Sequence, residues 1–193
     1  MHRTIEYTVT KHQQGMTILD YLKMQGFSRH ILSSMKGDKG AISLNGTFAY
    51  GRTPLIPGDR LSIRLKETQP SENIQPTFME LNILFEDEDI LVLNKPADTP
   101  IHPSMGNYTN TLANGVAYYY ALKGEPFVYR CINRLDRDTT GALILAKNAL
   151  SAAILSQQMA ARQIKRTYLA IVQGVLPPKG TINAPIARVQ GSV

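Results

Sequence analysis

From residue 133 the sequence reads Asn133-Arg134-Leu135-Asp136-Arg137-Asp138-Thr139-Thr140-Gly141, and it continues directly into Ala142-Leu143-Ile144-Leu145-Ala146-Lys147. The first stretch is rich in charged, hydroxyl and glycine residues, which are typical of a loop. The second has the length and apolar composition of a buried strand. Functional residues are often placed on loops that a rigid scaffold holds in position. We therefore expect the chain to be organised around this loop and the strand that follows it.

Asp136 is the most reactive candidate in the loop. In an extended segment, residues two apart point to the same side, so Arg134 and Asp136 are expected to share a face. A neighbouring guanidinium keeps a carboxylate ionised, and an ionised, positioned carboxylate can act as a nucleophile. The same pattern is also typical of a structural ion pair that closes a loop, and the residues by themselves leave both interpretations open.

The motif Arg134-Leu135-Asp136, then two residues, then Thr139-Thr140-Gly141 resembles the signature of the RluA-type RNA pseudouridine synthases. That family usually has histidine where this chain has Asn133. The resemblance implies that Asp136 is the catalytic nucleophile and that Arg134 and Thr139 bind the substrate. The resemblance also extends to residues 84–96, whose sequence is similar to the segment that usually precedes the active-site loop in that family.

Composition and charge limit the classes of protein to which this chain can belong. The chain has 193 residues, of which 43% are hydrophobic, and it carries a net charge of +6. Residues 1–70 hold ten Lys and Arg against five Asp and Glu, whereas the remainder is nearly neutral. A basic N-terminal part favours a polyanionic partner. The single cysteine, Cys131, and the absence of a long apolar run predict a cytoplasmic protein without a membrane span.

Residues 1–66 are predicted to form a small unit of their own. A strand over 3–9 precedes two short helices, over 16–22 and 28–35, and two further strands, over 41–44 and 60–65. The order of these elements resembles the alpha-L RNA-binding domain. The resemblance implies that Arg29 and Lys36, on and just after the second helix, face RNA. Each of them could equally be a solvated surface charge.

Residues 67–79 are polar, contain two prolines and are expected to be a linker. Residues 80–193 are expected to form the N-terminal part of a pseudouridine synthase catalytic domain. Two strands are expected over 81–85 and 90–94, with an acidic turn between them. The four acids are more simply explained as charges that protect an exposed hairpin end than as ligands of a metal. Helices are expected over 111–123 and 149–162. Strands are expected over 165–174 and from 181 to 186.

Two further residues complete the predicted site. His102 lies in a rigid, proline-flanked loop that borders the active cleft in the related family, so it is expected to contact the substrate. A loop histidine can also be purely structural. Tyr168 could be a core aromatic residue, but Arg166 and Tyr168 match the place where the family has an active-site tyrosine, which implies a catalytic role.

The sequence thus predicts an α+β protein with a small alpha-L domain followed by a mixed, largely antiparallel sheet with flanking helices. The expected function is isomerisation of uridine to pseudouridine in structured RNA, either rRNA or tRNA, with no cofactor and no metal. Nothing in residues 175–193 resembles the family's later segment that supplies an arginine to the aspartate. We therefore expect a truncated catalytic domain with weak or no activity, and a non-catalytic RNA-binding protein is the alternative. A glycoside hydrolase based on Asp136 and Asp138 is disfavoured, because its two carboxylates normally come from different elements. The sequence does not indicate the oligomeric state.

Overall fold

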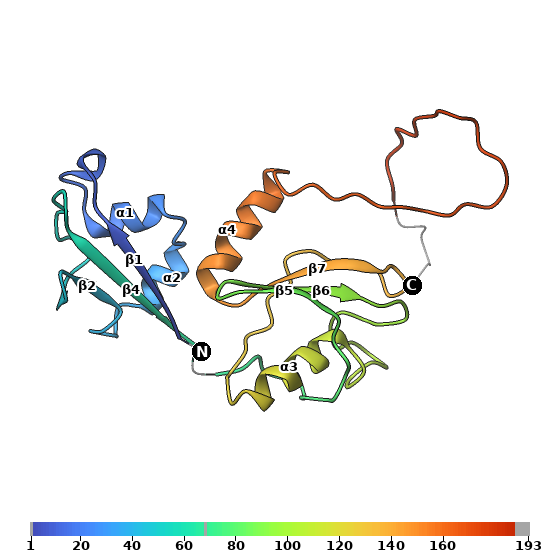
Figure 1. Cartoon of the computed structure of the whole chain (residues 1–193), viewed down its shortest axis with the longest axis horizontal. Coiled ribbons are helices and arrows are strands. Elements are labelled where there is room, and N and C mark those ends of the chain that lie inside the picture. Colours follow the sequence, from blue (N-terminus) through green and yellow to red (C-terminus); the bar gives the residue numbers. More distant parts are fainter. Residues whose placement is uncertain (1, 68, 188–193) are drawn as a thin grey trace.

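The fold consists of two antiparallel sheets, each covered by helices (Figure 1). A computed structural model describes residues 2–67 and 69–187, so parts of the predicted domains, at residues 1, 68 and 188–193, lie outside the described residues. Every strand pairing is antiparallel. The predicted α+β class is therefore confirmed. The structure describes no helix long and apolar enough to cross a membrane.

The first sheet is built from the N-terminal third of the chain. Its strands are β1 (His2–Thr8), β2 (Ile42–Leu44), β3 (Thr47–Phe48) and β4 (Arg60–Lys66), in the order β1-β4-β2-β3. The β2–β3 turn is Asn45-Gly46, in which both residues have positive φ, as a tight hairpin turn of this type requires. A short 3₁₀ helix (Lys11–Gln13) precedes α1 (Ile18–Met24) and α2 (Arg29–Ser34).

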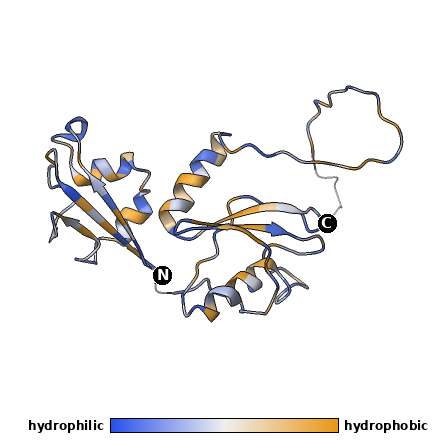
Figure 2. Ribbon diagram, viewed as in Figure 1, coloured by the Kyte–Doolittle hydropathy of each residue, from blue (hydrophilic) through white to orange (hydrophobic). Residues whose placement is uncertain are grey.

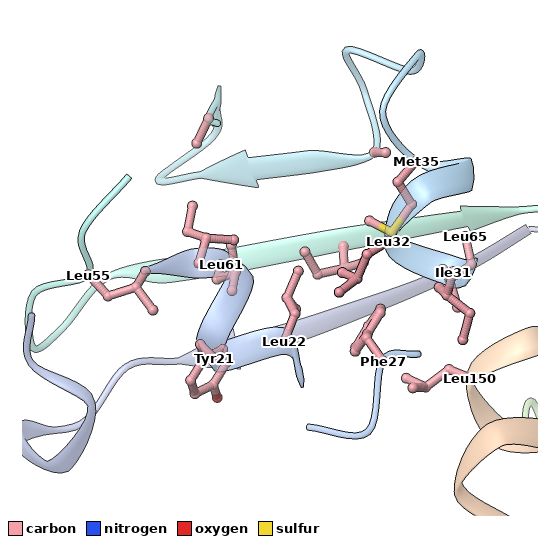
Figure 3. Packing of buried hydrophobic residues seen from close by; sticks show 14 of the residues in the cluster. Tyr21, Leu22, Phe27, Ile31, Leu32, Met35, Leu55, Leu61, Leu65 and Leu150 are labelled. Carbon is pink, nitrogen blue, oxygen red and sulfur yellow. The ribbon is translucent and has the colours of Figure 1, made fainter. Parts of the chain in front are cut away.

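Side-chain caps start both helices of this unit. The Thr17 hydroxyl accepts a hydrogen bond from the backbone N–H of Asp20, and the Ser28 hydroxyl accepts one from that of Ile31. Such caps satisfy backbone donors that have no partner within the helix. The apolar faces of α1 and α2 then pack on one face of the sheet, and Figure 3 shows Leu22, Ile31 and Leu32 meeting Leu61 and Leu65 there.

The second sheet carries the loop of interest. Its strands are β5 (Ile83–Glu86), β6 (Ile90–Lys95) and β7 (Gly141–Ala146), with β6 in the centre. Helix α3 (Leu112–Leu122) buries one face against Leu91, Leu93, Leu143 and Leu145, which come from the two longer strands. The predicted helix over 111–123 and strands around 81–94 are confirmed to within a few residues.

Helix α4 (Ala149–Ala160) joins the two sheets. It follows β7, yet its Leu150 is buried in the core of the first sheet beside Phe27 and Ile31 (Figure 3). At the same junction Arg3 of β1 forms ion pairs with Glu88 (2.7 Å) and Asp89 (3.0 Å). The N-terminal unit is therefore in direct contact with the rest of the chain.

The segment between the sheets has no regular secondary structure in its described residues, yet it is attached along its length. Ser71 donates its backbone N–H to the carbonyl of Phe127 and accepts a hydrogen bond from the N–H of Tyr129. The Asn114 side chain of α3 donates to the carbonyl of Gln75. The boundaries of a linker at 67–79 and of the units on either side stay a prediction.

The two strands predicted after α4 are wrong for the described residues. Residues 163–187 form no helix and no strand, although they include the apolar run Leu169-Ala170-Ile171-Val172, and Figure 2 shows hydrophobic stretches along this segment. Leu169 and Ile171 are 99% and 100% exposed. A strand exists only where its backbone pairs with a neighbour, and neither sheet pairs with this segment. Local alternation therefore predicted an element that tertiary structure does not supply.

Candidate active site

The loop at residues 133–140 is held against β7 by a side chain. Asn133 is buried, and its amide donates to the carbonyl of Ala142 (3.0 Å) while its carbonyl accepts from the N–H of Ile144 (2.8 Å). The amide thus pairs with the strand as a backbone peptide group would. The preceding backbone at Ile132 donates to the carbonyl of Ile144. The start of the loop is therefore an extension of the sheet, with its position fixed by hydrogen bonds.

Lys95 fixes the middle of the loop from inside the protein. Its side chain is completely buried at the end of β6. The ammonium donates to three carbonyls, those of Pro96 (2.8 Å), Thr99 (3.0 Å) and Arg137 (2.6 Å). Burial lowers the pKa of Lys95, and the nearby carboxylates of Asp138 and Asp136 oppose that shift by favouring the charged form. A cation is thus placed beneath the loop that carries both acids.

Alternate residues of the loop face opposite sides. Leu135 packs on the core of the second sheet, whereas Arg134 and Asp136 are exposed. The predicted shared face of Arg134 and Asp136 agrees with this alternation. No ion pair joins these two side chains, both of which the structure describes. The guanidinium of Arg137 instead pairs with Asp98, at the outer end of the loop.

His102 lies in the loop between β6 and α3. Its ring meets Tyr129 edge to face at a centroid distance of 5.0 Å. Burial lowers the pKa of His102, and the positive charge of Arg134 lowers it further. His102 is therefore a neutral imidazole at pH 7, able to donate or accept one hydrogen bond. The role of His102 at the site stays a prediction.

Tyr168 borders the loop of Asp136. A pocket of about 200 Å³ is lined by residues of the loop and of the segment after α4, including Leu135, Thr140, Arg166 and Tyr168. Asp136 is not among its lining residues, and the Tyr168 ring is 56% exposed. The structure thus places Tyr168 beside residues that flank Asp136.

The remaining predicted site residues divide between the loop and the first unit. Thr139 is half-buried and closes a turn by donating its N–H to the carbonyl of Asp136 (3.1 Å). Arg29 and Lys36 are exposed, on and just after α2, on the helical side of the first sheet. They belong to a different surface from the loop.

Sequence reasoning missed the residues that hold the loop in place. A lysine at the end of the apolar run Ile90-Leu91-Val92-Leu93, just before a proline, was a signal that its side chain could be buried. Cys131 is half-buried and packs against the second core, with its thiol donating to the carbonyl of Asn133. Burial raises the pKa of Cys131 to about 11, which leaves the thiol protonated and unreactive.

Comparisons with known proteins agree on one family. The sequence profile described as RNA pseudouridylate synthase matches residues 89–192. The RNA pseudouridine synthase YhcT of Bacillus subtilis (strain 168) is 39% identical over 96% of this chain and 62% of its own length. Ribosomal large subunit pseudouridine synthase D of Haemophilus influenzae is 34% identical over 96% of this chain and 57% of its own length. The chain therefore spans about three fifths of the length of these relatives.

Two solved human structures are similar to parts of this chain. Human RNA pseudouridylate synthase domain containing 1 is similar with a TM-score of 0.35 and 25% identity, over 49% of this chain and 31% of that one. The corresponding human protein, domain containing 4, has a TM-score of 0.34 and 30% identity, over 42% and 30% of the two chains.

Proposed function

The chain belongs to the RNA pseudouridylate synthase family, and from that premise we propose that it isomerises uridine to pseudouridine in RNA. The relatives named for the ribosomal large subunit favour rRNA as the substrate. In this isomerisation the bond from the ribose carbon to N1 of uracil is exchanged for a bond to C5. The proton that leaves C5 is balanced by the one that N1 gains, so the reaction needs no oxidant and no hydrolysis.

The observation that carries the proposal is the presentation of Asp136. Its carboxylate is exposed on a loop whose backbone is held by Lys95 from beneath and by Asn133 at its start. Such preorganisation lets a reactive group meet its substrate without first ordering the loop. We assign Asp136 as the group that acts on the nucleoside. A uridine must leave its base stack to reach it, which costs a few kcal/mol.

The neighbouring side chains have supporting roles in this proposal. Arg134 supplies a cation for a phosphate next to the displaced nucleotide, and neutral His102 supplies a hydrogen bond. Thr139 maintains the turn at Asp136 and faces the substrate. Tyr168 is proposed to stack on the uracil once the RNA draws the exposed segment over the loop. Arg29 and Lys36 bind the phosphate backbone away from the reacting base.

The test is release of tritium from RNA labelled at C5 of uridine, measured with the chain in excess over RNA. We expect slow, Asp136-dependent release, and we expect Asp136→Asn to reduce it by about 10³-fold or more, since a residue that forms the reacting bond has no substitute. Asp138→Asn, a matched exposed acid in the same loop, is expected to retain most of the activity. Equal release by wild type and Asp136→Asn would overturn the assignment.

One observation favours a second function. Tyr168 lies in a segment that forms no secondary structure, and it is 56% exposed. A chain that binds RNA through its first unit and releases no tritium would be a non-catalytic RNA-binding protein. In that case Asp136→Asn would leave RNA affinity unchanged, and the proposal of catalysis by this chain would be refuted.

A further inference from the structure

No helix formed by the described residues covers the second face of the first sheet. Helices α1 and α2 pack on the face that carries Leu61, Ile63 and Leu65. Along β4 these buried residues alternate with Arg60, Ser62, Arg64 and Lys66, which therefore lie on the opposite face. In β1 the exposed residues His2, Thr4, Glu6 and Thr8 are directly opposite them in the register. We call this polar surface the outer sheet face.

An exposed pair of aromatic rings lies at one edge of the outer sheet face. Phe48 of β3 is directly opposite Ser43 of β2, which is opposite Ser62 of β4, so all three share this face. The ring of Phe48 meets that of Tyr50 edge to face at 4.8 Å. The two residues are 44% and 72% exposed. Two adjacent exposed rings at a sheet edge offer apolar contact area to a ligand.

A shallow hollow lies on the same face, and its lining includes Ser43, the residue directly opposite Phe48 in the register. It has a volume of about 740 Å³, and its lining includes Ser43, Ser62, Thr8, Arg60 and Glu6. The hydroxyl groups and the guanidinium can bind phosphate and ribose oxygens. Arg60 forms no ion pair with any described residue, so its charge is available to a ligand. Glu6 is the one acid in the lining, and it lies across from Ser62.

The charge of the outer sheet face favours an anion. Arg60, Arg64 and Lys66 form a basic column along β4. Asp38 pairs with Lys66 (2.7 Å) and more distantly with Arg64 (3.8 Å). Asp38 and Glu6 together offset two of the three positive charges, so the face keeps one net positive charge, and Arg60 is the basic residue of the column that forms no ion pair with a described acid. Aromatic rings beside a basic groove are the combination with which proteins bind unpaired nucleotides, because every base can stack and every phosphate is an anion.

We propose that the outer sheet face binds unpaired nucleotides of RNA, with bases stacked on Phe48 and Tyr50 and a phosphate bound by Arg60. This inference rests on the proposed function for its choice of RNA. Arg29 lies on α2 and Lys36 just after it, and α2 packs on the other face of the sheet. The first unit would thus hold RNA on two sides, with the outer sheet face selecting single-stranded segments.

The test is binding of a short fluorescein-labelled oligouridine, followed by fluorescence anisotropy. We expect the double variant Phe48→Ala, Tyr50→Ala to bind about tenfold more weakly or worse. Arg60→Gln should weaken binding by a smaller factor and reduce the salt dependence by about one phosphate contact. Tyr108→Ala changes an aromatic residue that is 66% exposed and lies outside the first sheet, and it should bind as the wild type does. Circular dichroism would verify that each variant is folded. Folding is expected because the substituted side chains are exposed.

A second measurement maps the contact directly. An oligouridine containing 4-thiouridine is expected to crosslink to the peptides with Phe48 or Tyr50 when irradiated. Unchanged affinity in the double variant, or crosslinks of the oligouridine only to α2, would overturn the inference. The two exposed rings would then be assigned to contact with a protein partner. Neither measurement requires catalysis. Weakened binding in a chain that makes no pseudouridine would refute the proposed function alone, whereas unchanged binding in an active chain would refute this inference alone.

Discussion

Replacing Glu86 by glutamine should cost the second sheet much of its stability at neutral pH. The Glu86 carboxylate lies at the end of β5 and accepts hydrogen bonds from Lys147 (2.8 Å), Tyr119 (2.6 Å) and Tyr120 (2.9 Å). These donors connect β5 with α3 and with the residue that follows β7. The Glu86 side chain is 19% exposed and that of Lys147 is 12% exposed, so water screens the pair only weakly.

The pKa of Glu86 provides the size of the effect. Burial raises this pKa, but the hydrogen bonds from Lys147, Tyr119 and Tyr120 outweigh burial and lower it from 4.5 to about 2. A difference of about 2.5 units, at 1.36 kcal/mol per unit, corresponds to about 3 kcal/mol in favour of the folded state. Because the pKa is lower in the folded state, this contribution is complete above about pH 4.5. It is lost as the pH falls from there towards 2.

The assay is urea unfolding of wild type and Glu86→Gln at pH 7 and at pH 3, followed by tyrosine near-ultraviolet circular dichroism. We expect the variant to be about 3 kcal/mol less stable at pH 7 and only about 1.4 kcal/mol less stable at pH 3, where the wild-type carboxylate has lost half of its advantage. Glu80→Gln changes an exposed acid nearby and should alter stability by under about 0.5 kcal/mol. A stability difference that is equal at both pH values, or below 1 kcal/mol at pH 7, would refute the reasoning.

Three further outcomes are expected. Lys95→Met should lower the free energy of unfolding by about 3 kcal/mol and reduce activity, because three carbonyls lose their buried donor; unchanged urea unfolding would contradict this. Leu150→Ala should cost about 3 kcal/mol by opening a cavity in the first core, whereas Leu122→Ala on an exposed site should cost under about 0.5 kcal/mol; equal losses would show that α4 does not stabilise the N-terminal unit. Cys131 should react with iodoacetamide at pH 8 about a hundredfold more slowly than free cysteine, since burial raises its pKa to about 11; reaction at the free rate would show that the thiol is exposed.

The parts of the candidate site that depend on neighbouring residues in the sequence were predictable. Asp136 and Arg134 follow from the loop motif, and their shared side follows from the two-residue period of an extended chain. The pairing of Arg137 with Asp98 was not predictable, because these residues are far apart in sequence and meet only when the end of β6 packs under the loop. The same holds for Lys95, whose role depends on three carbonyls that the fold brings to one point.

The sequence by itself determined the helices, the hairpin turn at Asn45-Gly46 and most strands, because caps, positive-φ residues and hydrophobic period act over a few neighbouring residues. Only the tertiary structure decided that Leu150 of α4 completes the core of the first sheet and that Arg3 pairs with Asp89. It also decided that residues 165–174 do not form the strand that their alternation predicts. Side-chain pattern sets which face a segment would bury, but a strand or a core contact forms only where another part of the chain is in position to receive it.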